Sequence, residues 1–331
     1  MNYRKPKYIL LFTLFCAMVS SCDIHQFPDP SPKEIQFVLH LDYSTELPLH
    51  KIVEYTEDTK SAGAGHDIRY IINVYDAQDT AGKTVLHSFT LTKDDVSKLD
   101  HSIVLSIPEG SYRFVVWTDY VVQGSEEDHH YQTDRFEYIT LPEGDHRGST
   151  DVRDAFTGSV TSDVSEKVQE ARVSMSRPLA KFNFISTDLQ EFIARSLEES
   201  KNKSSSPVEL DDLIAVFIYN GYMPSAYNLH TEKPTDARPN VYFRSKIVQL
   251  NEHEAEMGFD YLFINGDETT ASIALEVYDS EENLLSRFKP VDVPLVRSKL
   301  TTIKANFLTS EADGGVAVNP DYDGNHTIVV P

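Results

Sequence analysis

The residue with the clearest chemistry in this sequence is a cysteine near its start. Cys22 directly follows Val19, Ser20 and Ser21, and small residues before a cysteine are typical of a lipobox. In such a motif the cysteine thiol forms a thioether with a diacylglyceryl group, and a signal peptidase then cleaves in front of the cysteine. We therefore predict that Cys22 is lipidated and is the first residue of the mature protein.

The residues before Cys22 have the composition of a signal peptide. Arg4, Lys5 and Lys7 precede an apolar run of 12 residues at 8–19. An ordinary secretory signal or a short membrane helix is the alternative, but a helix needs about 20 apolar residues to cross a bilayer. We predict a signal peptide at residues 1–21 and attachment to the outer membrane by lipid, including palmitate, since two or three acyl chains bind almost permanently.

No known catalytic motif is present elsewhere in the sequence. A Gly-rich phosphate loop, a Gly-x-Ser-x-Gly elbow and a His-Glu-x-x-His helix are all missing. Cys16 leaves with the signal peptide and Cys22 is lipidated, so no thiol remains as a nucleophile or for a disulfide. We predict a protein that is not an enzyme, with no catalytic residues, no cofactor and no metal.

Two loops nevertheless contain side chains that can bind metals. His129 and His130 follow the acidic residues 126–128, but neighbouring loop residues converge poorly on a metal, so we expect a solvated loop. Residues 321–325, Asp-Tyr-Asp-Gly-Asn, are similar to part of a calcium loop. The Glu that such a loop needs at position twelve is missing, so we interpret these residues as a turn.

The mature chain carries a large negative charge. Loss of Arg4, Lys5 and Lys7 leaves 27 Lys and Arg against 52 Asp and Glu, a net charge of −25. Such a surface repels nucleic-acid phosphates and anionic lipid headgroups. We therefore expect no nucleic-acid partner, and we interpret the acidity as an aid to solubility at a crowded cell surface.

Alternating apolar residues predict a mainly β protein. Residues 22–33 contain prolines at every second position from Pro28 to Pro32, which favours an extended tether. Residues 34–43 then alternate as in a half-buried strand. Further strands are predicted at 68–76, 85–91, 102–107, 112–120, 136–141, 164–175, 179–185, 213–219, 241–243, 260–264, 271–278, 284–288, 300–308 and 326–330.

One helix interrupts the predicted strands. Thr187 can cap it, and Leu189, Phe192, Ile193 and Leu197 recur at helical spacing along one face. The many short strands around it favour a sandwich. The mature length is too great for one typical core and favours two domains.

Tyrosines concentrate in the second half of the chain, at Tyr219, Tyr222, Tyr227, Tyr242 and Tyr261. Stacked tyrosines can bind sugar rings, which makes a surface glycan-binding lipoprotein the alternative function. Core and cross-strand packing explains most of these residues with fewer assumptions. A hydrolase is a third hypothesis, and it needs two carboxylates about 5 to 9 Å apart in one cleft.

Four stretches carry a family resemblance: residues 110–120, 148–156, 177–181 and 300–308. Together they resemble lipoproteins of the Bacteroidales fimbrillin superfamily, most closely its branch of anchors and minor subunits. The resemblance implies two tandem transthyretin-like (Greek-key) β-sandwich domains with one or two short helices, at residues 34–176 and 177–331. It also implies outer-membrane lipidation and a part in fimbria assembly or adhesion, with fimbrial subunits, and host or glycan ligands, as partners.

Fimbriae of this family are thought to grow by donor-strand exchange. An unpaired sheet edge with an apolar face binds a strand from another subunit. In polymerising members, cleavage after an arginine removes the first strand. Here the first arginine after Cys22 is Arg69, beyond the strand at 34–43. We therefore expect the first strand to stay in place, as suits an anchor, and the strand at 326–330 to complete its own domain.

Overall fold

The computed structural model describes residues 33–43, 53–55, 60–62, 65–96, 98–203, 206–310 and 326–329. The chain divides into two units, Met1–Glu34 and Ile35–Pro331, and the described residues belong almost entirely to the second. The predicted signal peptide, Cys22, the tether up to residue 32 and the turn at 321–325 lie outside the described residues.

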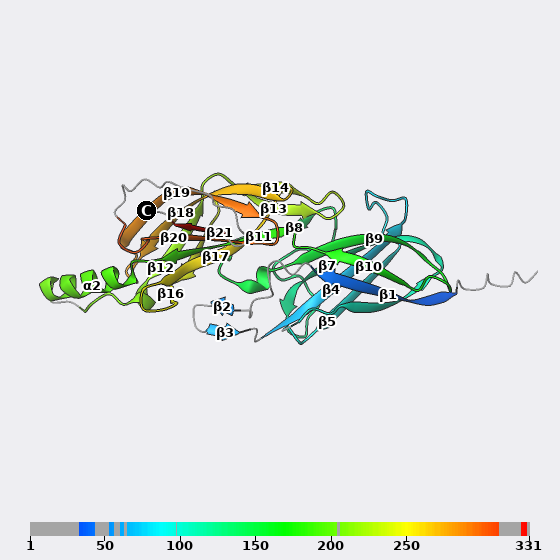
Figure 1. Ribbon diagram of the computed structural model, residues 1–331, viewed down its shortest axis with the longest axis horizontal. Coiled ribbons are helices and arrows are strands. Elements are labelled where there is room, and N and C mark those ends of the chain that lie inside the picture. Colours follow the sequence, from blue (N-terminus) through cyan, green and yellow to red (C-terminus); the bar gives the residue numbers. More distant parts are fainter. Residues whose placement is uncertain are drawn as a thin grey trace, which may run out of the picture. The chain divides into compact units, whose positions relative to one another are not determined.

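Two sheets form a β-sandwich in the first half of the chain (Figure 1). The three-stranded sheet has the order β10 (Glu170–Met175), β1 (Glu34–Tyr43) and β6 (Ser102–Pro108). The four-stranded sheet has the order β5 (His87–Lys93), β4 (His66–Asp76), β7 (Gly110–Val122) and β9 (Phe156–Val164). Apolar side chains from both sheets form one buried cluster between them.

The second half repeats this arrangement. Its first sheet has the order β16 (Val248–Gln249), β17 (Ala255–Phe263), β11 (Leu179–Ser186), β20 (Leu300–Ala305) and β21 (His326–Val329). Its second sheet has the order β15 (Tyr242–Lys246), β12 (Ile214–Tyr219), β18 (Glu268–Tyr278) and β19 (Leu284–Val296). The fold is thus mainly β, as predicted.

Shorter elements connect and flank the two sandwiches. One three-stranded sheet has the order β14 (Lys233–Pro239), β13 (Tyr222–Asn228) and β8 (Ile139–Thr140). A two-stranded sheet pairs β2 (Val53–Tyr55) with β3 (Lys60–Ala62). Two 3₁₀ helices, η1 (Asp151–Arg153) and η2 (Leu210–Asp212), complete the described elements together with the α-helix α2 (Leu189–Lys203).

Helix α2 confirms the predicted helix but differs from it in its N-cap residue. Its first turn begins where the Phe192 N–H donates to the Asp188 carbonyl, so Asp188, rather than Thr187, is the N-cap residue. Leu189 and Phe192 are buried, whereas Ile193 and Leu197 are exposed. The helix therefore packs through its first turn. Within the described part of the chain, no helix has the length and apolar composition required to span a bilayer.

Two predicted strand assignments are wrong in detail. The predicted strand at 164–175 is interrupted by a tight turn that leads from β9 in one sheet to β10 in the other, and Ser165 and Val168 exchange backbone hydrogen bonds in this turn. The turn has no Gly or Pro, because the Ser165 hydroxyl accepts from the Lys167 and Val168 N–H groups instead. Strands β13 and β14 were not predicted, since both contain prolines that are uncommon inside a sheet.

The larger apolar cluster links the two halves. It contains most buried residues of the second sandwich together with Ile71, Tyr75, Val115 and Trp117 of β4 and β7. These two strands are therefore buried on both faces, with one face in each cluster. The predicted boundary between residues 176 and 177 stays a prediction.

Candidate functional site

The first strand of the chain lies between two strands that are distant from it in sequence. Strand β1 pairs in parallel with β10, from Val38 opposite Glu170 to Tyr43 opposite Met175. On its other side it neighbours β6, where the Leu41 N–H donates to the His101 carbonyl at 2.9 Å. In Figure 1, β1 (blue) runs beside β10 (green). Because β1 separates β10 from β6, its removal leaves a groove with two unpaired edges.

The inner face of β1 is apolar and fully covered. Ile35, Phe37, Leu39 and Leu41 are each at most 4% exposed. Phe37 stacks on Phe114 of the opposite sheet, with ring centroids 5.2 Å apart. Burial of each such side chain contributes about 1.5 to 3 kcal/mol. The predicted alternation of this strand is confirmed, and its burial holds it firmly in the sandwich.

Arg69, the first arginine after Cys22, is buried. Arg69 lies within β4, and its side chain is 2% exposed. It donates Nε to Asp119 Oδ1 at 2.9 Å and Nη2 to Asp119 Oδ2 at 2.7 Å. Its backbone is part of a ladder with β5 and β7. The arginine is therefore structural, and it lies beyond β1 in the chain.

Strand β21 gives the second sandwich an additional edge strand. It pairs in parallel with β20, from Thr301 opposite His326 to Lys304 opposite Val329. Strand β20 corresponds to β10, because each pairs in parallel with the first strand of its own sandwich. In the described three-stranded sheet, however, β10 is an edge. Strand β21 thus has no counterpart among the described strands of the first sandwich. The sandwich forms with or without a strand in that position.

A cluster of buried ionic side chains joins the two halves, and we name it the junction cluster. It contains three ion pairs: Asp151 with Lys181, Arg153 with Asp260, and Asp154 with Arg177. In each pair one partner lies within residues 151–154, around η1, and the other lies in the second half. Residues 148–156 and 177–181, two of the stretches that carry the family resemblance, supply most of this cluster.

The geometry of the junction cluster is specific. The Arg177 Nε and Nη2 atoms each donate to the Asp154 carboxylate at 2.7 Å, and the guanidinium lies 4.4 Å from the Phe156 ring centre. Lys181 Nζ donates to Asp151 Oδ1 at 2.6 Å, and the Tyr261 hydroxyl donates to the same oxygen. Gly148 is required nearby, because an added Cβ comes within 2.4 Å of the Phe243 ring.

Asp260 is the most heavily bonded residue of the junction cluster. Its carboxylate pairs with Arg153, accepts a hydrogen bond from the Tyr219 hydroxyl at 2.6 Å, and lies 2.6 Å from His146 Nε2. Burial raises the pKa of Asp260, but Arg153 and His146 outweigh burial and hold it below its ordinary value. Burial, followed by the negative charge of Asp260, raises the pKa of Tyr219 well above 10. The carboxylate therefore stays ionised and the phenol neutral.

The predicted tyrosine group is not a single surface. Tyr219, Tyr227 and Tyr261 are buried, whereas Tyr222 and Tyr242 are exposed. Tyr227 stacks on Phe263 with ring centroids 5.3 Å apart, and Tyr219 and Tyr261 donate to junction carboxylates. Three of the five residues are thus unavailable for sugar stacking, because the core and the ion pairs use them.

The loop that contains His129 and His130 is only partly solvated. Glu126, Glu127 and Asp128 are exposed, as predicted, but His130 is 8% exposed. The expectation of a solvated loop is therefore wrong for His130. The sequence did not connect this loop with His66, a residue more than 60 positions earlier, whose ring lies nearby.

The fold and the junction cluster define a mainly β protein built from two sandwiches. A model for a family of unknown function (DUF6562) matches residues 33–331. The chain belongs to this family. No curated protein matches the sequence.

Solved structures of several bacterial surface proteins are similar to the chain. A candidate polysaccharide-binding protein of Bacteroides thetaiotaomicron is 11% identical with a TM-score of 0.46, over 77% of this chain and 80% of that one. The fimbrial anchor protein Mfa2 of Porphyromonas gingivalis is 10% identical with a TM-score of 0.41, over 77% and 82%. A candidate cell adhesion protein of Bacteroides eggerthii is 12% identical with a TM-score of 0.42, over 90% and 96%. Similarities at this level assign no activity to the chain.

Proposed function

We propose that this protein is a lipoprotein of the outer membrane that acts as the anchor or a minor structural subunit of a fimbria. Lipid on Cys22 holds it to the membrane, and its sandwiches bind other subunits by strand complementation. The role is structural and involves no catalysis. The acidic mature surface suits a protein exposed at the cell surface.

The proposal rests mainly on the position of β1 in its sheet. An apolar strand lies between β10 and β6, two strands that do not pair with each other within the described sheet. A groove of this kind accepts a strand from the same chain or from another subunit equally well, because backbone pairing and side-chain burial are the same in both cases. Here the strand comes from the chain itself, and Arg69 lies beyond it, so the first groove stays filled.

With the first groove filled, another edge has to bind the next subunit. We assign this role to the β20 edge that β21 occupies. Among the residues that the structure describes, four pairs join β21 to β20, whereas β1 pairs with β10 through six and also neighbours β6. A longer donated strand can displace β21 at little cost, because it re-forms the same hydrogen bonds and adds more of them.

A lipidation variant tests the anchor role. Surface filaments are purified from cells that carry the native chain and from cells that carry Cys22→Ala, and both filaments and medium are probed for this protein. We expect it to co-purify with cell-bound filaments in the native strain, and filaments that contain the variant to be shed into the medium. Filaments that stay cell-bound, or that never contain the protein, contradict the proposal.

Two disulfide clamps distinguish which edge is used. Thr302→Cys with Thr327→Cys links β20 to β21, and His40→Cys with Arg172→Cys links β1 to β10, since each pair is opposite in register. We expect oxidation of the β20–β21 clamp to block incorporation into filaments, and reduction to restore it. The β1–β10 clamp is the matched control and leaves incorporation unchanged. If the β1–β10 clamp alone blocks incorporation, β1 is the exchanged strand and the assignment to β20 is wrong.

A further inference from the structure

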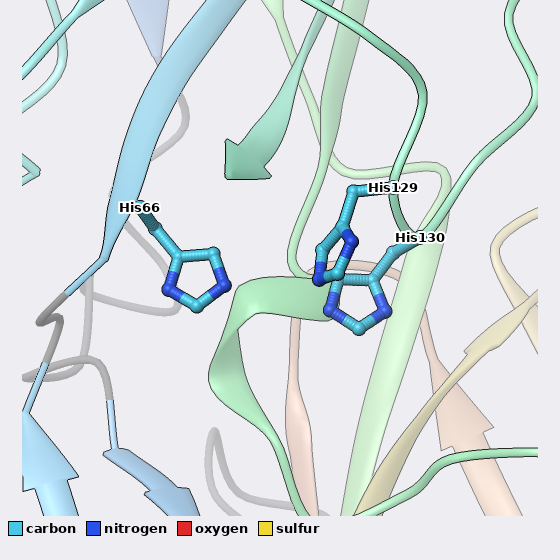
Figure 2. Close-up of side chains that lie close together, drawn as sticks. All are labelled: His66, His129 and His130. Atoms are coloured by element: carbon cyan, nitrogen blue, oxygen red, sulfur yellow. The ribbon is translucent and has the colours of Figure 1, made fainter. Parts of the chain in front are cut away.

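Three histidine rings converge at the end of the first sandwich. Figure 2 shows His66, from the start of β4, approaching His129 and His130 of the loop that follows β7. One ring nitrogen from each residue lies within 4.8 Å of the others. The ring centres of His129 and His130 are 4.2 Å apart, and those of His66 and His129 are 5.6 Å apart.

These distances are close to those of a tetrahedral metal site. Zinc–nitrogen bonds of about 2.0–2.1 Å place two ligand nitrogens about 3.4 Å apart in a tetrahedron. The three nitrogens therefore need to move by roughly 1 Å, which small rotations of the side chains supply. Three histidines from two separate segments also converge better than the two adjacent loop residues alone.

The backbone that carries the rings is held in place. We name residues 123–133 the histidine loop. The Gln123 N–H donates to the Gly65 carbonyl at 2.7 Å, and the Gly124 N–H donates to Asp67 Oδ2 at 2.8 Å, which fixes the loop beside His66. Arg69 Nη1 donates to the Glu126 carbonyl and to Asp128 Oδ1. A site on such supported backbone is closer to preorganised than one on a free loop.

The environment of His130 favours a ligand. The residue is 8% exposed, and its Nε2 atom has no hydrogen-bond partner among the residues that the structure describes. A buried nitrogen of this kind is costly unless something binds it.

Access and charge also permit a cation. A pocket of about 440 Å³ is lined in part by His129 and His130. Arg153 and Arg147 oppose a cation electrostatically, but Arg153 is paired with Asp260. Glu126 and Glu127 on the same loop add negative charge, and the mature chain is strongly acidic. Hard cations such as Ca²⁺ prefer oxygen ligands, whereas imidazole suits Zn²⁺.

We propose that His66, His129 and His130 bind one zinc-class transition-metal ion that links the start of β4 to the histidine loop. The fourth coordination position is open to water or to a donor from a partner. Because the ligands come from two segments, the ion cross-links them and stabilises this part of the first sandwich.

Isothermal titration of the detergent-solubilised mature protein, after treatment with a chelator, tests the site. We expect one Zn²⁺ per chain and a rise in melting temperature with Zn²⁺ but not with Ca²⁺. His66→Gln and His130→Gln are each expected to lower the affinity by more than about 100-fold. His253→Gln, at an exposed position before β17, is the matched control and leaves the affinity unchanged.

Co²⁺ provides a readout that does not depend on stability. We expect the visible absorption bands of tetrahedral Co²⁺ with the native chain, and their loss in His66→Gln, while far-ultraviolet circular dichroism verifies that the variant is folded. Binding that survives both substitutions overturns the proposal. Competition by Ca²⁺ at equal concentration overturns it as well, because the acidic side chains, rather than the histidines, are then the ligands.

Discussion

The charged residues of the junction cluster are buried in ion pairs, and each depends on its partner. Asp154 and Arg177 are 6% and 1% exposed and face each other in a bidentate pair. A buried pair contributes little net stability, because desolvation offsets the attraction between the charges. Loss of one partner is different, since the remaining charge stays buried without the carboxylate that it faced.

We predict that Asp154→Ala lowers the free energy of unfolding by about 3 to 5 kcal/mol. Urea unfolding of residues 33–331 measures this change. Asp42→Ala is the control, because Asp42 forms an exposed pair with Arg172 at 3.2 Å and its loss is expected to cost at most about 1 kcal/mol. Equal effects of the two substitutions contradict the prediction.

His146 is predicted to make the junction cluster sensitive to acid. Burial lowers the pKa of His146 below 6.5, with Arg153 adding to the effect, although Asp260 opposes it. Between the folded pKa and 6.5 the unfolded chain binds more protons, so stability falls as pH falls below about 6.5. Each such group contributes a slope of up to about 1.4 kcal/mol per pH unit.

The matching measurement is the free energy of unfolding at several pH values between 7 and 5, for the native chain and for His146→Gln. We expect the slope of the variant to be smaller by up to about 1.4 kcal/mol per pH unit. His130 and His230, whose pKa values burial also lowers, keep part of the slope. An unchanged slope in the variant means that His146 is not responsible.

At the scale of elements, alternation of apolar residues located most strands correctly. Strands β1, β6 and β12 were predicted within two residues of their observed ends. Alternation succeeds where one face is buried and the other is exposed, because the side-chain period is then visible in the sequence. It failed for the β13–β14 hairpin, whose prolines concealed the pairing.

Two hairpins of this protein are weakly alike in sequence. Residues 72–89 and 275–288 are weakly alike in sequence, and both form hairpins, with Ile72 opposite Phe89 and Leu275 opposite Phe288. In the sheets, however, β4 and β5 occupy the places that β12 and β15 occupy in the second half, not those of β18 and β19. The likeness in sequence reflects the common hairpin form and does not align the two halves.

At the scale of the whole molecule, the two halves depend on each other. The larger apolar cluster includes Trp117 and Ile71 of the first half, and the three ion pairs cross the boundary predicted at residues 176 and 177. Separation of the halves at that boundary exposes the apolar faces and leaves the charged residues of the three ion pairs without their partners.

We therefore predict that residues 177–331 alone do not fold cooperatively. Calorimetry and near-ultraviolet circular dichroism of this segment are expected to lack a sharp transition, whereas residues 33–331, the matched control, unfold in a single step. Lys181 and Asp260 are then left without Asp151 and Arg153, which is the physical reason. A sharp transition of the isolated segment at the control's temperature contradicts this prediction.

Residue types and local spacing were enough to predict the acidic charge, the mainly β fold and most strands, and they are also the basis for predicting lipidation at Cys22. They do not reveal which polar residues are buried or which partners those residues contact. The ion pairs of Asp151, Arg153 and Asp154, and the approach of His66 to His130, join residues that are far apart in the chain. No local period carries that information, since such contacts arise only when two sheets and a loop pack together.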